Sequence, residues 1–543
     1  MKFIVPLVSI CMLAAVFVHG SRPEENAATQ SVGVTVEGEI ESSQASASSD
    51  TTIAETCNPS EEHCGMKFNI DLLKELNSVA RKYPIPRGRK VAVGFNANVD
   101  MIVQGLAAVK DLIPKPRDVK EIRTLTDFVD SFAYWFQKGA AAERFVTSDK
   151  LFEQIVASAD SAEGKVLYRT GGNAALMATN LAGLSCKCDV LLGGIVGKQL
   201  NILLQSNIKT VGERGMQNDP VHLILEYPKG ATWNGMKAPR ANRFIVVRDE
   251  YNSKLKAFEP MLKYILKAQK ENVYFDVLIA SGLNQLEGLK PEERMNRVVE
   301  IKDTLKLLHS RTPIHLELAS MADRNFLKQM AEALLSISDS FGLNEEELAM
   351  LYEVLGGKYA TLIDGKIASK HPLKVFTREQ LTGKVPNPRA VSLALAYIMD
   401  YIDILSASSF GNRRLTRGHF HSLGFHIVVS RLNARKQSWS AMLDSAVAQG
   451  SVTATLKACG FPNDAIVNDR ITKRDIDLIS PLTFTVADGS KINLSLEKPV
   501  GVWDEGQYRF YFAPVLICHK PKVTVGLGDA ISSNGLAYSL KFQ

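Results

Sequence analysis

The sequence predicts an α/β protein built around a parallel sheet. Short apolar runs rich in β-branched residues alternate with longer segments of helical periodicity, and turn residues follow many of the runs. Polar and acidic side chains gather just after several runs, where parallel sheets commonly bind ligands. With 45% apolar and 22% charged residues over 543 positions, the chain is long enough for a large core and two to three domains.

The front of the chain predicts a secretory signal peptide over residues 1–20, because Met1-Lys2 precede an apolar run from Phe3 to Val18. The run is shorter than the roughly 20 apolar residues of a spanning helix, so we expect no stable membrane span. A retained signal anchor is the alternative. Residues 21–65 are rich in Ser, Ala, Glu and Thr and predict a disordered linker, with the ordered domain over 66–543. The C-terminus has no KDEL-type signal, so the endoplasmic reticulum lumen and secretion both remain open.

The composition and the cysteine spacing limit the kinds of partner and metal site that we expect. A net charge of +6 is mild for this length. The sequence has no basic stripe interleaved with aromatic residues, so nucleic-acid binding is not indicated. Six of the seven cysteines follow the signal, and Cys57–Cys64 and Cys459–Cys518 are candidate disulfides, whereas Cys186-x-Cys188 is too close for a relaxed one. The sequence contains no Cys-x-x-Cys pair, so its cysteine spacing does not indicate a zinc site. Asn493-Leu-Ser495 is a possible glycosylation sequon.

The first predicted strand, residues 89–95, runs into Asn96-Ala-Asn98-Val-Asp100. In extended chain these three polar side chains share one face, where they would grasp sugar hydroxyls; capping of a turn is the alternative. Further on, Gly171-Gly172-Asn173 opens a helix of small residues. Such a turn lets the backbone approach a ligand closely, or serves tight packing.

Strands are also expected over residues 187–194, 222–227 and 244–247. The turn Gly194-Ile-Val-Gly197-Lys198 lacks the spacing and the Ser/Thr of a P-loop, and no strand-linked G-x-G-x-x-G occurs, so both nucleotide motifs are disfavoured. Arg240 and Arg243 lie beside the last of these strands. They would clamp a phosphate or remain solvated surface residues.

Two more strands, residues 276–284 and 313–320, alternate with helical segments, and Glu317 and Glu347 then fall near strand exits. Carboxylates gathered at one sheet edge favour a hard cation such as Mg²⁺. For Glu347 a helix cap is the alternative, because Asn344-x-x-Glu347 fits a capping box.

His419-x-His421 lies in a further predicted strand, which places both imidazoles on one face. No third ligand of matching type is evident, so we favour a structural or polar-lining role over metal binding. The apolar run from Tyr508 to Cys518 predicts two short strands broken at Pro514.

The stretch that organises the chain lies near its C-terminus. Val523–Val525 predicts a strand, Gly526-Leu-Gly528-Asp529 a turn, and Ala530 onward a helix. Free N–H groups at such a helix start attract anions. A carboxylate at that place fits a base that takes a proton, which points to phosphoryl transfer onto a hydroxyl. An ordinary turn with an Asp helix cap is the alternative.

Taken together these segments resemble the ADP-dependent glucokinases of the ribokinase-like superfamily, over residues 66–543. The resemblance rests on five motifs in the family's order: Asn96-Ala-Asn98-Val-Asp100, Gly171-Gly172-Asn173, His315-Leu-Glu317, Asn344-x-x-Glu347 and Gly526-Leu-Gly528-Asp529. With a secretory signal in front, the chain is similar to the animal branch.

The resemblance implies a large Rossmann-like α/β/α lobe and a smaller α/β lid formed mainly within about 97–250. It implies phosphorylation of glucose with ADP as donor and Mg²⁺ as cofactor, in glycolysis, by a monomer. The implied sites are the base Asp529; the sugar ligands Asn98, Asp100, Glu143, Gly172 and Asn173; the phosphate ligands Arg243, Gly526 and Gly528; and the metal ligands Glu317 and Glu347, with Asp529 near the metal's shell.

Other functions stay open. The chain would be a kinase of another sugar, such as fructose 6-phosphate, or one that uses another donor; Asn98, Asp100 and Glu143 favour a neutral sugar. A secreted sugar- or nucleotide-binding protein without catalysis is the alternative outside enzymes. The region of about 430–470, where adenine is expected, offers no fingerprint.

Overall fold

The structure, a computed structural model, describes residues 62–541 apart from several gaps. The gaps are residues 84, 86–87, 120, 140–141, 162–165, 185–187, 213–218, 240–241, 320, 322, 357–375, 384, 408–414, 433–438, 440–441, 462–465, 467–470, 472–475, 520 and 523–525. The signal peptide, residues 21–61 of the predicted linker, Arg240, Cys57, the Cys64 side chain, Cys186 and the predicted strand Val523–Val525 therefore lie outside the described residues. The last four residues assigned to the linker, 62–65, instead belong to the first helix, so the ordered domain begins earlier than the predicted residue 66.

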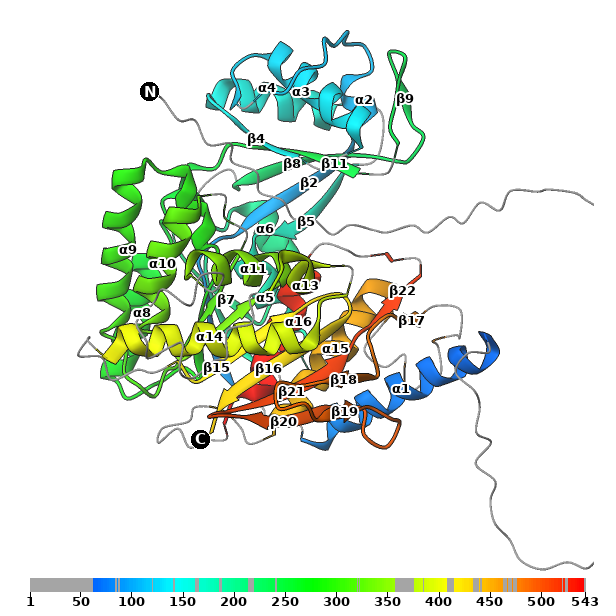
Figure 1. Ribbon diagram of the computed structural model, residues 1–543. Coiled ribbons are helices and arrows are strands. Elements are labelled where there is room, and N and C mark those ends of the chain that lie inside the picture. Colours follow the sequence, from blue (N-terminus) through cyan, green and yellow to red (C-terminus); the bar gives the residue numbers. More distant parts are fainter. Residues whose placement is uncertain are drawn as a thin grey trace, which may run out of the picture.

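A ten-stranded sheet forms the larger lobe (Figure 1). Seven neighbouring strands are parallel and three at one edge are antiparallel. In sheet order the strands are β20 (Gly501–Glu505), β21 (Tyr508–Pro514), β16 (Phe425–Arg431), β15 (Arg417–His421), β14 (Ser340–Leu343), β13 (Ile314–Glu317), β12 (Val277–Ala280), β1 (Lys90–Gly94), β6 (Asp189–Gly193) and β7 (Ile208–Val211).

A six-stranded sheet forms the smaller lobe, at the top of Figure 1. Its strands lie between residues 98 and 247, while β6 and β7 from the same interval join the larger sheet. In sheet order they are β3 (Glu121–Ile122), β4 (Ala142–Val146), β11 (Asn242–Val247), β8 (Val221–Tyr227), β2 (Asn98–Gln104) and β5 (Leu167–Gly171).

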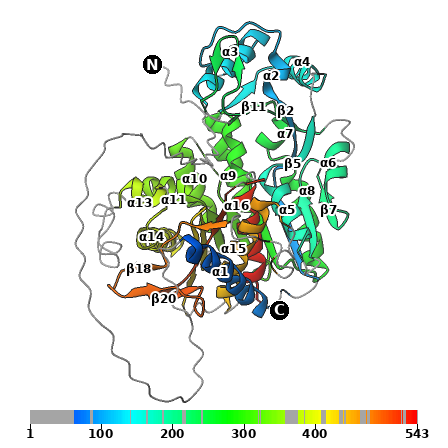
Figure 2. The same cartoon turned by 90° about the vertical axis from the view of Figure 1, so that its right-hand side faces the viewer.

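Helices cover both faces of the larger sheet, which gives an α/β/α sandwich (Figure 2). One face packs on α8 (Phe258–Lys270), α9 (Pro291–Leu305), α10 (Arg324–Leu335), α11 (Glu345–Val354) and α14 (Pro388–Ala407). The other face packs on α1 (Glu62–Lys82), α5 (Asn173–Ala182), α15 (Leu443–Cys459) and α16 (Leu527–Ser539).

Among the described residues, three helices pack on one face of the smaller sheet. Phe132, Phe244, Leu223 and neighbouring apolar side chains bury that face against α2 (Gly105–Val109), α3 (Leu125–Lys138) and α4 (Asp149–Asp160). Figure 1 shows these helices on the side turned away from the large lobe. The opposite face of the sheet is therefore the one that meets the large lobe.

Short elements complete the described chain. They are α6 (Lys198–Leu203), α7 (Glu250–Ser253), the 3₁₀ helix η1 (Leu283–Gly288), α13 (Arg378–Thr382), and the two-stranded pairs β9 (Thr232–Trp233) with β10 (Met236–Lys237), β17 (Ile476–Leu478) with β22 (Leu516–Cys518), and β18 (Thr483–Thr485) with β19 (Lys491–Asn493).

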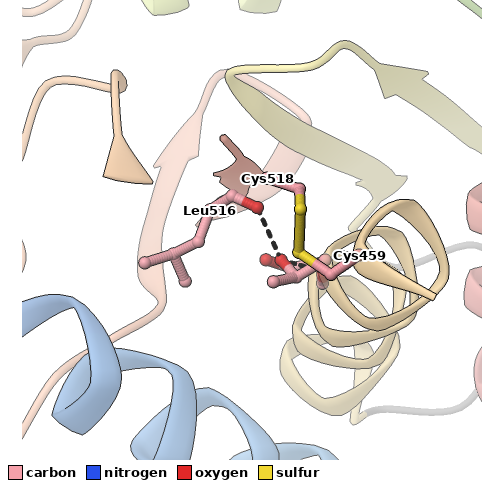
Figure 3. The surroundings of a disulfide bond; sticks show 5 residues. Cys459, Leu516 and Cys518 are labelled. Carbon is pink, nitrogen blue, oxygen red and sulfur yellow. Dashed lines mark hydrogen bonds between the residues drawn. A yellow bond between two sulfur atoms is a disulfide. The ribbon is translucent and has the colours of Figure 1, made fainter. Parts of the chain in front are cut away.

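Several local predictions are confirmed. The run Tyr508–Cys518 divides at Pro514 into β21 and β22. Cys459, at the end of α15, and Cys518, in β22, form the predicted disulfide, with Cα atoms 5.4 Å apart (Figure 3). Among the described residues, no helix is both long and apolar enough to cross a membrane.

Candidate active site

Asp529 stands in the first turn of α16, directly after the glycine turn. Gly526 is the N-cap residue with φ +67°, a left-handed conformation that glycine adopts without strain. The side chain of Asn173, at the start of α5, donates to Oδ1 of Asp529 at 2.9 Å. The predicted base is therefore joined to the predicted sugar-binding turn, although the two residues lie 356 positions apart in sequence.

The surroundings of Asp529 suit a proton acceptor. Burial raises the pKa of Asp529 to about 6, and the negative charge of Glu317 acts in the same direction. The hydrogen bond from Asn173 and the positive charge of Lys457 oppose that rise in pKa. A carboxylate with a pKa near 6 is still ionised at neutral pH, and it is a better proton acceptor than an ordinary aspartate.

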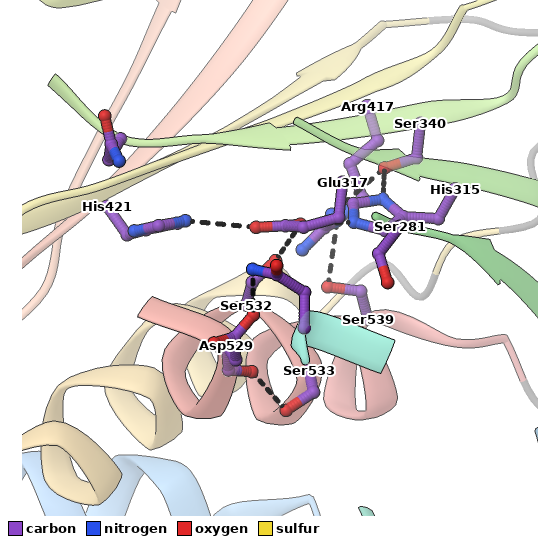
Figure 4. Close-up of polar contacts among 12 residues, drawn as sticks. Ser281, His315, Glu317, Ser340, Arg417, His421, Asp529, Ser532, Ser533 and Ser539 are labelled. Carbon is purple, nitrogen blue, oxygen red and sulfur yellow. Dashed lines mark hydrogen bonds and ion pairs between the residues drawn. The ribbon is translucent and has the colours of Figure 1, made fainter. Parts of the chain in front are cut away.

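Glu317, the last residue of β13, is the centre of a buried polar network (Figure 4). Its Oε2 atom accepts from Ser532 at 2.5 Å and lies 2.9 Å from Nε2 of His315, and its Oε1 lies 3.2 Å from Nε2 of His421. Burial alone would raise the pKa of Glu317, but the hydrogen bonds from the two histidines outweigh it and hold the pKa at about 2. Glu317 is therefore a fixed negative charge.

Helix α16 lies close against this network because its facing residues are small. Gly528, Ser532, Gly535 and Ser539 recur at spacings of four, three and four, which places them on one helix face. A methyl group on Gly535 would come within 2.8 Å of the His419 ring, and one on Gly528 within 3.1 Å of the His421 ring. The same face that packs on the buried histidines thus fixes the position of Asp529.

Glu347 forms the capping box that its spacing from Asn344 predicts. The backbone N–H of Asn344 donates to Oε2 of Glu347 at 2.9 Å, and its side-chain amide donates to Oε1 at 3.0 Å. Burial raises the pKa of Glu347 to about 8, although the hydrogen bond from the Asn344 backbone acts against the rise. A cation near Glu347 would favour its ionised form.

The predicted metal ligands fit Mg²⁺ by type, because hard cations prefer carboxylate oxygens. Their oxygens are already engaged, however: those of Glu317 by two imidazoles and a hydroxyl, and those of Glu347 by the Asn344 amide groups. Within the part of the chain that the structure describes, no three His, Cys, Asp or Glu side chains form a group able to enclose a metal ion. Glu317, Glu347 and Asp529 thus do not make a three-carboxylate cage, and they suit a cation held through water.

The face of the small sheet that meets the large lobe carries charged side chains. Asp100 in β2 pairs with His222 in β8, Glu143 in β4 pairs with Ile245 in β11, and Arg243 lies two residues before Ile245. Paired and alternate positions share a face of a sheet, so these four side chains project from the same one. Glu143 and Arg243 are only half-buried there.

Asn98 and Asp100 fit tightly against the predicted glycine turn. Nδ2 of Asn98 donates to Oδ1 of Asp100 at 2.8 Å, as expected for neighbours on one face of a strand. A methyl group on Gly171 would lie 2.1 Å from Oδ1 of Asp100, and one on Gly172 2.9 Å from Oδ1 of Asn98. That Oδ1 atom of Asn98 is buried without a hydrogen-bond partner, so it is available to a ligand hydroxyl.

The two acids on this face are held in a low-polarity setting. Burial raises the pKa of both Asp100 and Glu143, and the positive charge of His222 opposes the rise in each case. His222 itself lies 3.3 Å from Asp249. Burial would lower the pKa of His222, but the Asp249 carboxylate raises it above its ordinary value.

A buried amide joins this face to the crossing between the lobes. Asn252 accepts from the N–H of Ala97 at 3.3 Å and donates to its carbonyl at 3.1 Å, and it also donates to Asp249. Ala97 lies on the segment that leads from β1 into the small sheet, and residues 248–257 lead back. His222, Asp249 and Asn252 therefore tie the polar face to both crossings.

Two of the residues at the site are missing from the sequence prediction. His222 and Glu226 lie on one face of β8 with Ile224 between them, and Leu223 and Leu225 lie on the other face. This pattern does not show which residues of other strands lie across from His222. Lys457 lies in α15 and donates to the Gly526 carbonyl. Nothing in the local sequence around Lys457 indicates that contact.

The sequence predicts that Arg243 binds a phosphate of ADP. The charges it interacts with are Asp100 and Glu143, on the sugar side. No described contact joins it to Gly526–Asp529, so an interaction with ADP phosphates stays a prediction.

The fold and the site define a class of protein. The structure of a phosphofructokinase from Pyrococcus horikoshii, solved with AMP, superposes with a TM-score of 0.58 at 20% identity, covering 84% of this chain and 98% of that one. The predicted fold, a large Rossmann-like α/β/α sandwich with a smaller α/β lobe, is thereby confirmed.

Sequence comparison then shows the family. The model of the ADP-specific phosphofructokinase/glucokinase conserved region matches residues 89–538. An ADP-dependent glucokinase from Bos taurus is 33% identical over 463 residues, covering 84% of this chain and 85% of the relative. An ADP-dependent glucose/glucosamine kinase from Pyrococcus furiosus is 26% identical over 490 residues, covering 84% and 96%. The chain belongs to the ADP-specific phosphofructokinase/glucokinase family and is a sugar kinase.

Proposed function

We propose that the chain transfers a phosphoryl group from ADP to D-glucose and releases AMP and glucose 6-phosphate. The observation that supports the proposal is the hydrogen bond from Asn173 to Asp529, which joins the carboxylate proposed as the base to the Gly171–Asn173 turn proposed to bind the sugar. The likeness to the bovine ADP-dependent glucokinase supports the choice of donor and acceptor.

Asp529 would act as the general base. It takes the proton of the sugar's 6-hydroxyl while that oxygen forms a bond to the β-phosphorus of ADP, and the bridging oxygen leaves with AMP. The N–H groups of the Gly526–Asp529 turn and the helix dipole then stabilise charge on the transferring group. The contribution of such a base is about 10²- to 10⁴-fold in rate.

The lid face would hold the sugar. Asn98, Asp100 and Glu143 offer amide and carboxylate groups to hydroxyls, and the backbone at Gly172 approaches them closely. Closure of the lid over the sandwich would exclude water and so prevent loss of the phosphoryl group to hydrolysis.

Glu317 and Glu347 would hold Mg²⁺ through water. The ion would supply positive charge against the donor's phosphates. Glu317 suits that role because it stays ionised, and Ser532 keeps it aligned with the helix that carries Asp529.

A second acceptor deserves a test because the lid face also carries cations. Arg243 and His222 lie beside Asp100 and Glu143. Positive charges there would suit a sugar phosphate such as fructose 6-phosphate, although the two carboxylates would repel it.

The test is a donor and acceptor panel with the purified chain and Mg²⁺. Glucose and fructose 6-phosphate are each offered with ADP and with ATP, and products are resolved by ³¹P NMR. Glucose 6-phosphate and AMP from the glucose–ADP pair support the proposal. Product from fructose 6-phosphate alone overturns the acceptor, product with ATP alone overturns the donor, and no product from any pair overturns the catalytic assignment.

We also propose that residues 1–20 direct the chain into the secretory pathway and are then removed. The glucose 6-phosphate that the chain makes would enter glycolysis. The apolar run from Phe3 to Val18 supports this. Expression in animal cells and sequencing of the mature N-terminus test it. A chain that keeps Met1 and stays in the cytosol would contradict it.

A further inference from the structure

Lys457 lies beneath the turn that precedes Asp529, although it comes from a helix 69 residues before Gly526. Its Nζ donates to the carbonyl oxygen of Gly526 at 3.2 Å and to Oδ1 of Asn180 at 3.0 Å. The side chain is half-buried. An ammonium group thus reaches the backbone of the proposed phosphate turn from below.

Helix α5 connects Lys457 with the proposed base. Asn173 donates to Asp529, and Asn180 accepts from Lys457. The two asparagines are seven residues apart, or about two helical turns, so they lie on one face of α5. One rigid helix therefore sets the positions of both the carboxylate and the ammonium.

The bond to Gly526 fixes the direction of a donor on the other side of the turn. A peptide group is planar and trans, so its C=O and the following N–H point in opposite directions. With the Gly526 carbonyl held by Lys457 and by the N–H of Ala530, at 3.1 Å, the N–H of Leu527 points away from α15. Leu527 is the first residue of α16, where N–H groups have no partner within the helix.

The end of α15 is itself immobilised. Cys459, two residues after Lys457, is bonded to Cys518, and the N–H of Lys522 donates to the carbonyl of Ala458 at 2.7 Å. Thr455 in the same helix donates to the carbonyl of Leu516 at 2.8 Å. The backbone that carries Lys457 is therefore held in place.

The positive charge of Lys457 interacts with the Asp529 carboxylate. Burial lowers the pKa of Lys457, and the nearby Asp529 carboxylate opposes that change. Two of its three N–H groups are used by Asn180 and Gly526. Most of the hydrogen-bonding capacity of this ammonium group is therefore used by other groups of the protein.

We propose that Lys457 is a positioning residue for phosphoryl transfer, which orients the peptide between Gly526 and Leu527 so that its N–H faces the transferring group. The inference rests on the proposed function for its catalytic consequence. The inference that Lys457 holds the turn at Gly526 in place rests on its hydrogen bonds alone. Lys457 would act on kcat, because it orders the turn, and much less on the KM values of glucose or ADP.

The experiment compares the full chain with three variants: Lys457→Met, Asn180→Ala, and the control Lys522→Met. The control removes a lysine that is exposed and lies near the same helix end. Asn180→Ala keeps the charge of Lys457 and removes one partner of its ammonium, so it serves if Lys457→Met does not fold. Two readouts are taken: kcat and KM for glucose and ADP, and hydrogen exchange of the peptide that spans Gly526 to Asp529.

We expect Lys457→Met to lower kcat by about 10²-fold, the usual effect of a small misplacement at a reacting centre, with KM values close to the wild type. Exchange at the turn should rise in Lys457→Met and Asn180→Ala, but not in Lys522→Met. Turn exchange equal to that of the control, or a loss confined to the KM of ADP, would overturn the inference. If the wild type shows no turnover, the proposed function fails, while the exchange data still decide whether Lys457 holds the turn.

Discussion

Replacing Gly171 with alanine should weaken sugar binding selectively. The new methyl group would lie 2.1 Å from Oδ1 of Asp100 and 2.3 Å from Nδ2 of Asn98, well inside van der Waals contact. Gly171 is the register partner of Asn98 in the pairing of β5 with β2, so the backbone has little room to retreat. The side chains of Asn98 and Asp100 are short and buried, and they must turn away from the positions that we propose face the sugar.

The magnitude follows from the interactions that are displaced. Moving these side chains breaks the 2.8 Å hydrogen bond between Asn98 and Asp100. A hydrogen bond to a charged group contributes about 1.5–3 kcal/mol, and overpacking a core position costs about 1–3 kcal/mol. At about 1.4 kcal/mol for each tenfold change, the KM of glucose should rise about 10- to 100-fold. The KM of ADP should change little, because the turn before Asp529 is untouched.

The assay is steady-state phosphorylation with glucose varied at saturating ADP, then the reverse. Gly183→Ala is the matched control, because a methyl group there has its nearest neighbour at 3.4 Å, an ordinary contact. A glucose KM in Gly171→Ala equal to that of the control would refute the placement of Asn98 and Asp100 at the sugar.

Three further predictions follow from the site. The kcat/KM of the wild type should fall as pH drops through about 6, because the pKa of Asp529 is raised from 3.8 to about 6 and the base must be ionised; a profile flat to pH 5 would count against it. Glu317→Gln should raise the Mg²⁺ concentration needed for half-maximal activity and weaken Mg²⁺ binding in calorimetry, whereas an unchanged titration would exclude Glu317 from the metal site. Asn252→Ala should lower the free energy of unfolding by about 2 kcal/mol, because two backbone groups of Ala97 lose their partner, and denaturant titration measures this; wild-type stability would contradict it.

Features that depend on local chemistry could be predicted from the sequence. The break at Pro514 follows from the missing backbone N–H of proline. The capping box of Asn344 and Glu347 follows from their spacing, and the shared face of Asn98 and Asp100 follows from the alternation of a strand. Each of these outcomes is decided within about four residues, so the sequence pattern contains the whole argument.

Contacts that depend on register and helix packing could not be predicted in this way. His222 lies beside Asp100 only because β8 pairs with β2, across more than a hundred residues of chain. Lys457 reaches Gly526 only because α15 and α16 pack together, and Ser532 reaches Glu317 only because small residues let α16 approach the sheet. The strand pairing and the interhelical distance that produce these contacts are set by the whole fold.

The most direct test of the account is the turnover of Asp529→Asn, a nearly isosteric change that removes the base. Calorimetry first checks that the variant still binds glucose and ADP, and kcat is then compared with the wild type in the presence of Mg²⁺. We expect retained binding and a kcat lower by about 10²- to 10⁴-fold. A kcat equal to that of the wild type, with binding intact, would contradict the assignment of Asp529 as the base.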